Sequence, residues 1–382
     1  MIKEVTINNF RGIEELKIQL KSINLFIGSN GTGKSSILDA IALAASSPSY
    51  VDGIGVNILE KVITRRGTPY HANLQHLIRV EADNASITIV EDSTNTIEIC
   101  NKDTIDSKKR EYRDEYKLND LDAQARTYIG NILAAKYLST LMNLLGGITQ
   151  QRMISQQLIS HEEAITYIFN KNQRHAVRLS IYDNHVVIIP QITPSTTRLT
   201  LIDNHVRFSE DIYGYLHELM LRYPNIYKNI MGFLKHKEIE DIRFNRAGDI
   251  VIKRVGDEHY IPINVIGDGT RLLLIDALVL NLPNVDIILL EEPENYMHPE
   301  YILKVVRSII EASKNYKKQF LITTHNIDII DYMIEDAEGS GIEKDIQIVM
   351  LYRDENGRIS LEYYNYDDAN EIKEALVDIR FM

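Results

Sequence analysis

The chain has 382 residues, of which 44% are hydrophobic and 25% are charged, and its formal net charge is −12. This length suffices for one large domain or two ordinary ones, and the composition excludes an intrinsically disordered chain. No apolar run approaches the roughly 20 residues of a membrane-spanning helix, and the single cysteine, Cys100, excludes an internal disulfide. The start, MIKEVTINNFRG, lacks the apolar segment of a signal peptide. We therefore expect a cytoplasmic protein with no membrane attachment and, because of its acidic charge, no general basic face for nucleic acid.

A phosphate-binding pattern lies near the start of the chain. In the segment FIGSNGTGKSS, Gly28, Gly33, Lys34 and Ser35 fill the pattern G-x-x-x-x-G-K-[ST]. The preceding INLFI predicts a buried strand and the following SILDAIALAA predicts a helix, which is the context this loop requires. Backbone N–H groups and the helix N-terminus would bind phosphates, Lys34 would reach the β- and γ-phosphates, and Ser35 would bind Mg²⁺. The residues predicted to bind the nucleotide here are Asn30, Gly31, Thr32, Gly33, Lys34, Ser35 and Ser36.

Two further apolar runs end in polar residues. The run Val285 to Leu290 predicts a buried central strand that is followed by Glu291 and Glu292. Carboxylates at this end of a strand lie where open α/β sheets bind ligands, so one can support Mg²⁺ while the next polarises water. The run QFLITTH predicts another strand and ends at His325. Each feature alone also fits an ordinary strand end, namely an acidic turn or a capped strand with a satisfied histidine.

A Gly-Asp-Gly loop precedes the acidic strand. In INVIGDGTRLLLIDALVLNLP this loop opens a predicted helix with apolar residues on more than one face. A glycine-rich loop at a helix N-terminus can bind a second anion.

The order and spacing of these motifs resemble ATP-binding-cassette ATPases, which include RecF-like heads, chromosome-maintenance heads and OLD-type ATPases. The nearest resemblance is to stand-alone AAA family ATPases related to OLD proteins. It is carried by VTINNFRGIEELKIQL and the phosphate loop, by GDGTR at 267–271, and by EEPE at 291–294 with His298 and Pro299 downstream. The resemblance covers residues 1–45 and 260–330 strongly and is thin between them.

The resemblance implies a role for each matching residue. Glu292 would be the general base, Glu291 would support Mg²⁺ with Ser35, and His325 would sense the γ-phosphate of ATP. The loop Gly267, Asp268, Gly269 and Thr270 would contact ATP that is bound to a second subunit, so a homodimer or higher homo-oligomer is expected. Arg11 resembles a basic residue that reaches the nucleotide in RecF-like heads.

Three departures from the family pattern stand out. Asp268 occupies a position where transporter-type cassettes have a small residue. A carboxylate there is unfavourable beside a γ-phosphate unless it turns away or caps the helix. Glu291 replaces the commoner aspartate. No glutamine loop is evident, since Gln75, Gln150 and Gln151 are only candidates.

The middle of the chain predicts mixed structure. The runs HLIRVEA, SITIVED and TIEIC predict antiparallel strands, and residues from Asp120 to about Asn170 predict helix with a break at Gly146 and Gly147. The similar segments LSIYDNHVVI and LTLIDNHVRF each predict a hairpin with an Asp-Asn turn, in which His185 and His205 are hairpin residues rather than metal ligands.

Taken together, these features predict an α/β P-loop NTPase of ABC-type head architecture, with a central mixed sheet, an antiparallel β-subdomain and an inserted helical lobe. The predicted division is residues 1–105, 106–245 and 246–382. The residues after His325 are too few for an OLD-type nuclease domain, and no long heptad run is present. We expect ATP hydrolysis with Mg²⁺, coupled to dimerisation and to a DNA or protein partner. A nucleotide-dependent switch without turnover is the alternative, and a small-molecule kinase is disfavoured.

Overall fold

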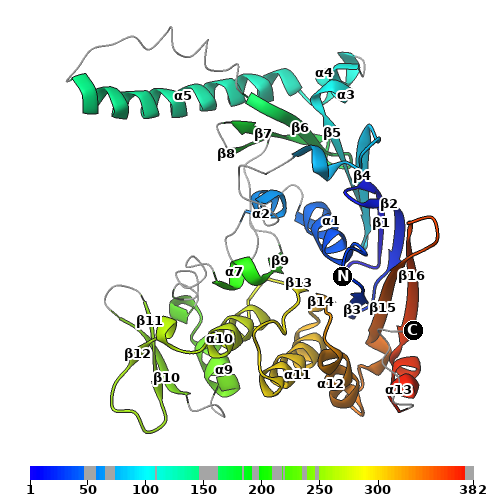
Figure 1. Cartoon of the computed structure of the whole chain (residues 1–382), viewed down its shortest axis with the longest axis vertical. Helices are drawn as coiled ribbons and strands as arrows, with labels where there is room; N and C mark the ends of the chain where they lie inside the picture. The colour runs from blue at the N-terminus through cyan, green and yellow to red at the C-terminus, as the bar shows by residue number, and fades with distance from the viewer. Residues whose placement is uncertain are drawn as a thin grey trace.

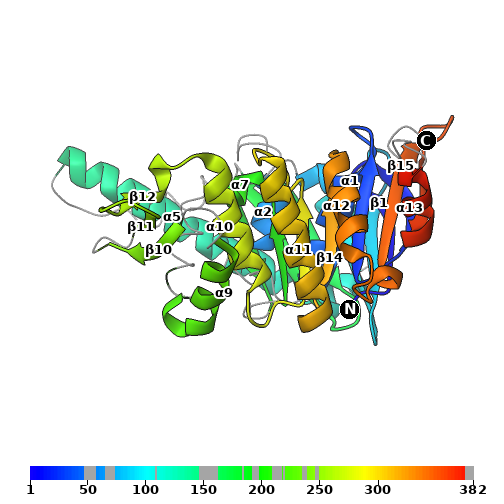
Figure 2. The same ribbon diagram turned by 90° about the horizontal axis from the view of Figure 1, so that it is seen from below.

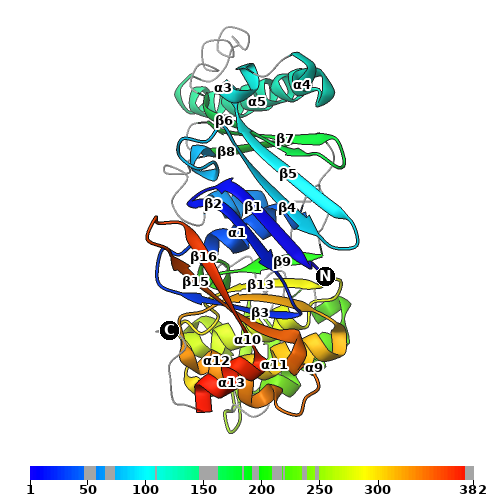
Figure 3. The ribbon, with the colours of Figure 1, turned by 90° about the vertical axis from the view of Figure 1, so that its right-hand side faces the viewer.

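The computed structural model describes residues 1–46, 57–64, 74–107, 110–145, 162–182, 185–191, 198–208, 217, 220–234, 239–245 and 249–374. Two large sheets and the helices packed on them form its layers (Figure 1). Between these sheets lies the helix α1 (Lys34–Ser46), whose side chains are buried almost all round because both sheets contact it. Figure 3 shows this layering from the side.

The six-stranded sheet carries the predicted motifs. Its order is β16-β15-β3-β14-β13-β9, and β3, β14 and β13 are parallel neighbours. Because parallel strands end at one edge of a sheet, the loops that follow these three strands lie together. The strands are β3 (Ile23–Gly28), β9 (Leu199–Ile202), β13 (Ile287–Glu291), β14 (Gln319–Thr323), β15 (Ile346–Arg353) and β16 (Ile359–Asn365).

The seven-stranded sheet is antiparallel and has the order β2-β1-β4-β5-β6-β7-β8. Alternate side chains of its first strands, such as Val5 and Ile87, face α1 and share a core with it. The strands are β1 (Glu4–Phe10), β2 (Ile13–Gln19), β4 (Asn84–Val90), β5 (Thr94–Asn101), β6 (Glu162–Asn170), β7 (His175–Tyr182) and β8 (His185–Pro190).

Helices cover the other face of the six-stranded sheet. Figure 2, a view from below, shows α10, α11 and α12 lying side by side in front of it. In α11 the apolar residues recur at helical spacing, with Ile302, Val305 and Ile309 buried, so one face packs on the sheet. The helices on this side are α9 (Pro224–Leu234), α10 (Asp268–Leu280), α11 (Pro299–Tyr316), α12 (Ile327–Ala337) and α13 (Tyr366–Glu374).

The long helix α5 (Leu118–Leu145) packs beside the far end of the antiparallel sheet and extends beyond it (Figure 1). The ring of Tyr167 and that of Phe169 lie in the core beneath this helix. Asp122 on α5 accepts hydrogen bonds from Tyr167 Oη at 2.6 Å and from Arg178 Nε at 2.8 Å. The helix is therefore fixed to the sheet by polar as well as apolar contacts.

Shorter elements complete the described chain. A small sheet with the order β10-β11-β12 lies beside α9 and α10 (Figure 1). No helix among the described residues has both the length and the apolar composition needed to cross a membrane. The shorter elements are α2 (Ile58–Thr64), η2 (Leu74–Leu77), α3 (Lys102–Ser107), α4 (Arg110–Glu115), α7 (Asn204–Phe208), β10 (Ile239–Phe244), β11 (Ile250–Arg254), β12 (Ile261–Pro262), η4 (Ile263–Val265) and η5 (Glu343–Asp345).

The fold class predicted from sequence is confirmed, and several local predictions are also confirmed. The runs SITIVED and TIEIC are the paired strands β4 and β5. The strands β7 and β8 form the first predicted hairpin, in which Tyr182 pairs with His185. The turn residues of that hairpin, like Gly146, Gly147, Gln150 and Gln151, lie outside the described residues.

Three local predictions are wrong. The segment LTLIDNHVRF is strand β9 followed by helix α7, because the Asp203 side chain accepts a hydrogen bond from Val206 N at 2.9 Å and so caps a helix instead of forming a hairpin turn. The first two residues of HLIRVEA end the 3₁₀ helix η2, and Ile78 forms a single bridge with Phe10. The helical pattern does not continue to Asn170, since β6 occupies 162–170 as the partner of β5.

The three-part division of the chain remains a prediction. Within its middle part, residues 106–245, β6 to β8 continue the antiparallel sheet and β9 joins the six-stranded sheet.

Candidate nucleotide-binding site

The phosphate loop follows β3 and opens α1, as predicted. Gly28 and Gly33 have φ values of 138° and 96°, which side chains rarely adopt. At Gly28 a close backbone neighbour also excludes a side chain, and at Gly33 the end of the Ile359 side chain would have to shift. A Cβ atom at Gly28 would lie 2.2 Å from the carbonyl oxygen of Leu351, and one at Gly33 would lie 2.7 Å from Cδ1 of Ile359. The loop conformation thus depends on glycine at both positions.

Lys34 lies at the start of α1 and its side chain is buried. Its ammonium group donates to the carbonyl oxygens of Gly28 at 2.7 Å and Ser29 at 3.0 Å. Burial lowers the pKa of Lys34 to about 8, and the nearby carboxylates of Glu292 and Glu291 oppose this shift. The ammonium group of Lys34 and the carboxylates at the end of β13 are therefore close in space.

The remaining loop residues differ in exposure. Asn30 and Gly31 are exposed, Ser35 is half-buried, and Thr32 and Ser36 are buried. The Thr32 hydroxyl donates to the carbonyl of Ser29 at 2.9 Å and so shapes the loop rather than facing outward.

The turn after β13 holds Glu292 in an unusual backbone conformation, with φ at 46°. Glu292 N donates to the carbonyl of Thr323 on β14 at 2.9 Å. The Glu292 carboxylate accepts a hydrogen bond from Asn295 Nδ2 at 2.7 Å, and its other oxygen lies 3.6 Å from Nε2 of His325. The predicted base and the predicted switch histidine are therefore neighbours, because their strands are adjacent and parallel.

Arg353, near the end of β15, is a site residue that sequence reasoning missed. Its guanidinium donates to the carbonyl of Gly31 through Nε at 3.2 Å and Nη2 at 3.0 Å, and to the carbonyl of Gly357 at 2.6 Å. The β15–β16 hairpin therefore braces the phosphate loop. No local motif could have indicated this contact, because it joins residues 322 positions apart.

Asn295 and Glu294 contact predicted site residues, which sequence reasoning did not foresee. Glu294 was noted only as part of EEPE, and its buried carboxyl accepts hydrogen bonds from Thr324 and His325 of the next loop. The available signal was the position of both residues directly after the paired carboxylates.

Arg11 has contacts on the other side of α1. It forms an ion pair with the buried Asp39 of α1 and donates to the carbonyl of Val62 at 2.6 Å. A direct contact with nucleotide remains a prediction for this residue. The side chain of Gln75 lies outside the description.

The predicted signature loop begins α10, with Gly267 as its N-cap. Asp268 is exposed and its carboxylate lies 3.4 Å from Nη1 of Arg271, so it turns toward an arginine. Gly269 is closely packed, since a Cβ atom there would lie 3.2 Å from the Tyr301 ring, whereas a Cβ at Gly267 would meet nothing within 4 Å. The Thr270 hydroxyl lies 3.4 Å from the Tyr301 hydroxyl.

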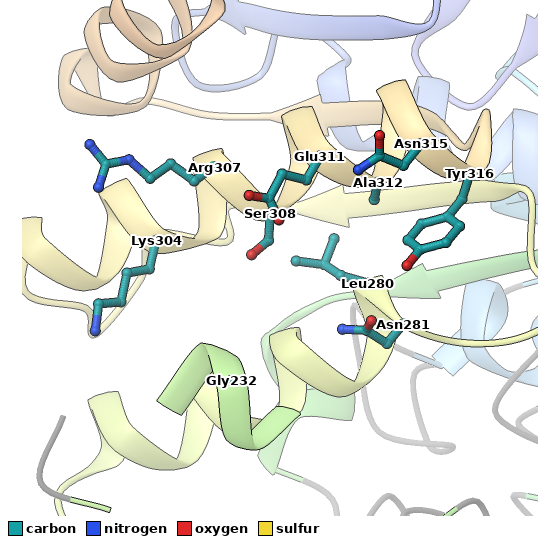
Figure 4. A pocket seen from close by; sticks show the side chains of 10 residues that line it. All are labelled: Gly232, Leu280, Asn281, Lys304, Arg307, Ser308, Glu311, Ala312, Asn315 and Tyr316. Atoms are coloured by element: carbon teal, nitrogen blue, oxygen red, sulfur yellow. The ribbon is translucent and has the colours of Figure 1, made fainter. Parts of the chain in front are cut away.

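A cavity of about 450 Å³ lies between α9, the C-terminal end of α10 and the part of α11 from Lys304 to Tyr316 (Figure 4). Its lining includes Leu280 and Asn281 at the end of α10, and Arg307 and Glu311 on α11. Its polar side chains carry both signs of charge. Its lining contains no phosphate-loop residue, so it is separate from the site described above.

Comparison with known proteins agrees with this geometry. A family model described as "AAA ATPase domain" matches residues 1–100. A second model, described as "AAA domain, putative AbiEii toxin, Type IV TA system", matches residues 168–331. The chain is 21% identical to Endonuclease GajA of Bacillus cereus, over 96% of this chain and 60% of that protein. It is also 21% identical to an ATP/GTP phosphatase of Helicobacter pylori, over 97% of this chain and 99% of that protein.

Among solved structures, the SmcHead bound to the C-winged helix domain of ScpA has a TM-score of 0.50 at 13% identity. The match covers 97% of this chain and 99% of that one, and at this identity it shows a shared fold. AAA-domain family models thus match two separate stretches of the chain, residues 1–100 and 168–331, and its fold is that of an α/β P-loop NTPase with an ABC-type head.

Proposed function

We propose that this protein binds ATP with Mg²⁺ and hydrolyses it to ADP and phosphate. The observation that carries the proposal is the convergence of three loops, which sets Glu292 between Asn295 and His325 and within electrostatic reach of Lys34. A base, an imidazole and a phosphate-binding cation at one strand edge suit phosphoryl transfer to water, where positioning and electrostatics dominate.

Each group has a distinct task in this proposal. The phosphate-loop N–H groups bind the phosphates, and Lys34 exchanges the carbonyls of Gly28 and Ser29 for phosphate oxygens. Glu292 accepts a proton from the attacking water, with its carboxylate held by Asn295. His325 donates a hydrogen bond from its imidazole toward the γ-phosphate.

The residues present fit Mg²⁺. The hydroxyl of Ser35 and the carboxylate of Glu291 are oxygen donors, which this ion prefers, and the interaction of Lys34 with Glu291 supports their proximity. When bound, Mg²⁺ would neutralise charge on the β- and γ-phosphate oxygens.

We further propose that hydrolysis requires a second copy of the chain. Gly267 to Thr270 would contact ATP in that copy, which gives a two-fold dimer with two shared sites. Two exposed apolar side chains near the Gly-Asp-Gly loop support a contact with a second copy. Val265 precedes this loop, and Tyr296 lies in the turn that follows Glu292. Burial of such side chains on closing would stabilise the dimer.

Nucleic acid or a protein is the proposed downstream partner. The similarity to a protein named as an endonuclease favours DNA modestly. The net charge of −12 restricts any DNA contact to a local basic patch.

Phosphate release at several protein concentrations, with and without duplex DNA, tests the proposal. Lys34→Ala should abolish release, and Glu292→Gln should keep ATP binding while losing about 10²–10⁴-fold in rate. Lys17→Ala, on an exposed part of β2, is the matched control. ATP binding and ATP-dependent dimerisation without phosphate release would instead favour the nucleotide-dependent switch. Unchanged phosphate release in Lys34→Ala would contradict both the proposed hydrolysis and the nucleotide-dependent switch.

A further inference from the structure

The turn after β13 contains a buried carboxyl that no step above uses. Glu294 is 8% exposed and three residues beyond the end of β13. Its Oε1 atom accepts hydrogen bonds from the Thr324 hydroxyl at 2.6 Å and from His325 N at 3.2 Å. Its Oε2 atom is buried and has no hydrogen-bond partner among the described residues. A half-satisfied buried carboxyl is costly, so its presence calls for a role.

These bonds belong to a chain that joins two loops. The Thr324 hydroxyl donates to Glu294 and also accepts a hydrogen bond from Asn326 N at 2.9 Å. The Asn326 side chain in turn caps α12 by accepting from Asp328 N at 2.7 Å. His325 lies between the two anchored residues, so its backbone is held on both sides while its imidazole stays partly exposed toward Glu292.

We propose that Glu294 is a positioning residue for His325. Its carboxyl ties the loop after β14 to the loop after β13, so that the imidazole and Glu292 keep one relative geometry during phosphate recognition. This inference rests on the proposed ATP hydrolysis, and it adds a residue that acts through the histidine without touching the nucleotide.

The charge of Glu294 is not needed for this task. Burial raises the pKa of Glu294, and the nearby Glu292 carboxylate acts in the same direction. A neutral side chain of the same shape can accept both hydrogen bonds equally well. Glutamine is therefore the conservative replacement, whereas alanine removes the acceptor.

The test is steady-state ATP hydrolysis by four variants of the full chain. Glu294→Ala and Thr324→Val should lower kcat by about 10- to 100-fold, the scale of a misplacement near 1 Å, with KM changed less than threefold. Glu294→Gln should retain kcat within about threefold of wild type. Thr323→Val is the matched control, because the buried Thr323 hydroxyl on β14 has no hydrogen-bond partner among the described residues; its kcat should not change.

A double-mutant cycle separates positioning from general structural support. Because Glu294 acts through His325, Glu294→Ala should cost nothing further in a His325→Ala background. Additive losses, or equal losses in Glu294→Gln and Glu294→Ala, would overturn the proposal.

An activity-independent readout keeps this inference separate from the proposed function. The imidazole NMR signals of His325, assigned with His325→Ala, should shift in Glu294→Ala and stay in place in Glu294→Gln. If wild type releases no phosphate, the proposed function fails and the NMR comparison still decides the role of Glu294. Unmoved signals in Glu294→Ala would contradict the positioning role even if hydrolysis is confirmed.

Discussion

Asn295 donates a hydrogen bond from Nδ2 to Oε2 of Glu292 at 2.7 Å, within the same tight turn. Asn295 N also donates to the carbonyl of Glu292 at 3.1 Å, so side chain and backbone fix the carboxylate together. Glu292 adopts a positive φ of 46°, and these bonds offset the strain of that conformation.

Asn295→Ala should therefore lower kcat while leaving ATP affinity close to wild type. Loss of one orienting bond to the base predicts up to a 10²-fold decrease in rate. Single-turnover hydrolysis and equilibrium binding of a fluorescent ATP analogue would measure the two effects. Asn315→Ala, at an exposed position on α11, is the matched control. A weakened affinity with normal kcat would place Asn295 in nucleotide binding instead.

Arg353→Ala should weaken ATP binding by roughly tenfold, which corresponds to about 1.4 kcal/mol. The guanidinium holds the Gly31 carbonyl, so its loss releases the phosphate loop into more conformations. Isothermal titration calorimetry with Glu292→Gln as background avoids turnover during the measurement. Arg358→Ala is the control from the same hairpin, since Arg358 contacts Glu14 instead. Equal affinities in the two variants would argue against a brace.

Gly267→Arg should abolish ATP-dependent dimerisation and hydrolysis but preserve ATP binding. A side chain at Gly267 enters open space within its own chain, whereas one at Gly269 meets Tyr301, so Gly267 is the cleaner position for probing a partner. Light scattering of Glu292→Gln with and without the second substitution measures assembly. Mixing Gly267→Arg with Lys34→Ala should restore some activity, because one shared site in each mixed dimer stays whole. A dimer that still forms with Gly267→Arg would contradict the shared-site arrangement.

Arg207→Met should destabilise the fold by about 3–5 kcal/mol. Arg207 on α7 is fully buried, forms an ion pair with Asp276 of α10 and donates to the carbonyl of Pro293 at 2.7 Å. The single substitution leaves a buried carboxyl without its cation. Urea unfolding followed by circular dichroism would measure the change. The double variant Arg207→Met, Asp276→Leu should recover part of the loss, and no recovery would show that packing dominates.

Lys318 should make stability depend on pH in the alkaline range. Burial lowers the pKa of Lys318 to about 8, from about 10.4 in an unfolded chain. Between these values the unfolded state binds more protons, so this residue makes the free energy of unfolding rise with pH, by at most about 1.4 kcal/mol per unit. Lys318→Met should remove that contribution, and Lys344→Met, at an exposed position, should not. Identical pH profiles for wild type and Lys318→Met would refute the assignment.

The sequence predicted the parts of the site that are continuous in the chain. The phosphate loop, the acidic end of β13 and the Gly-Asp-Gly helix start each have a local pattern that fixes both structure and chemistry. Contacts between distant segments could not be predicted this way. The hydrogen bond from the Arg353 guanidinium to the carbonyl of Gly31 is such a contact. The prediction of a hairpin turn at Asp203 failed for a related reason. Asp and Asn occur both in hairpin turns and at helix N-caps, and the surrounding structure decides between the two.

The position of β3 has a consequence for synthesis of the protein. This strand pairs with β14 on one side and β15 on the other, and the brace from Arg353 reaches back across 322 residues to Gly31. At 5–20 residues per second, a ribosome needs roughly 15–65 s to add that length. For most of this interval, until β14 is synthesised, the nascent phosphate-loop strand lacks both of its neighbours. Folding of the nucleotide site is therefore a late event, and we expect the emerging N-terminal half to depend on chaperones until the last strands appear.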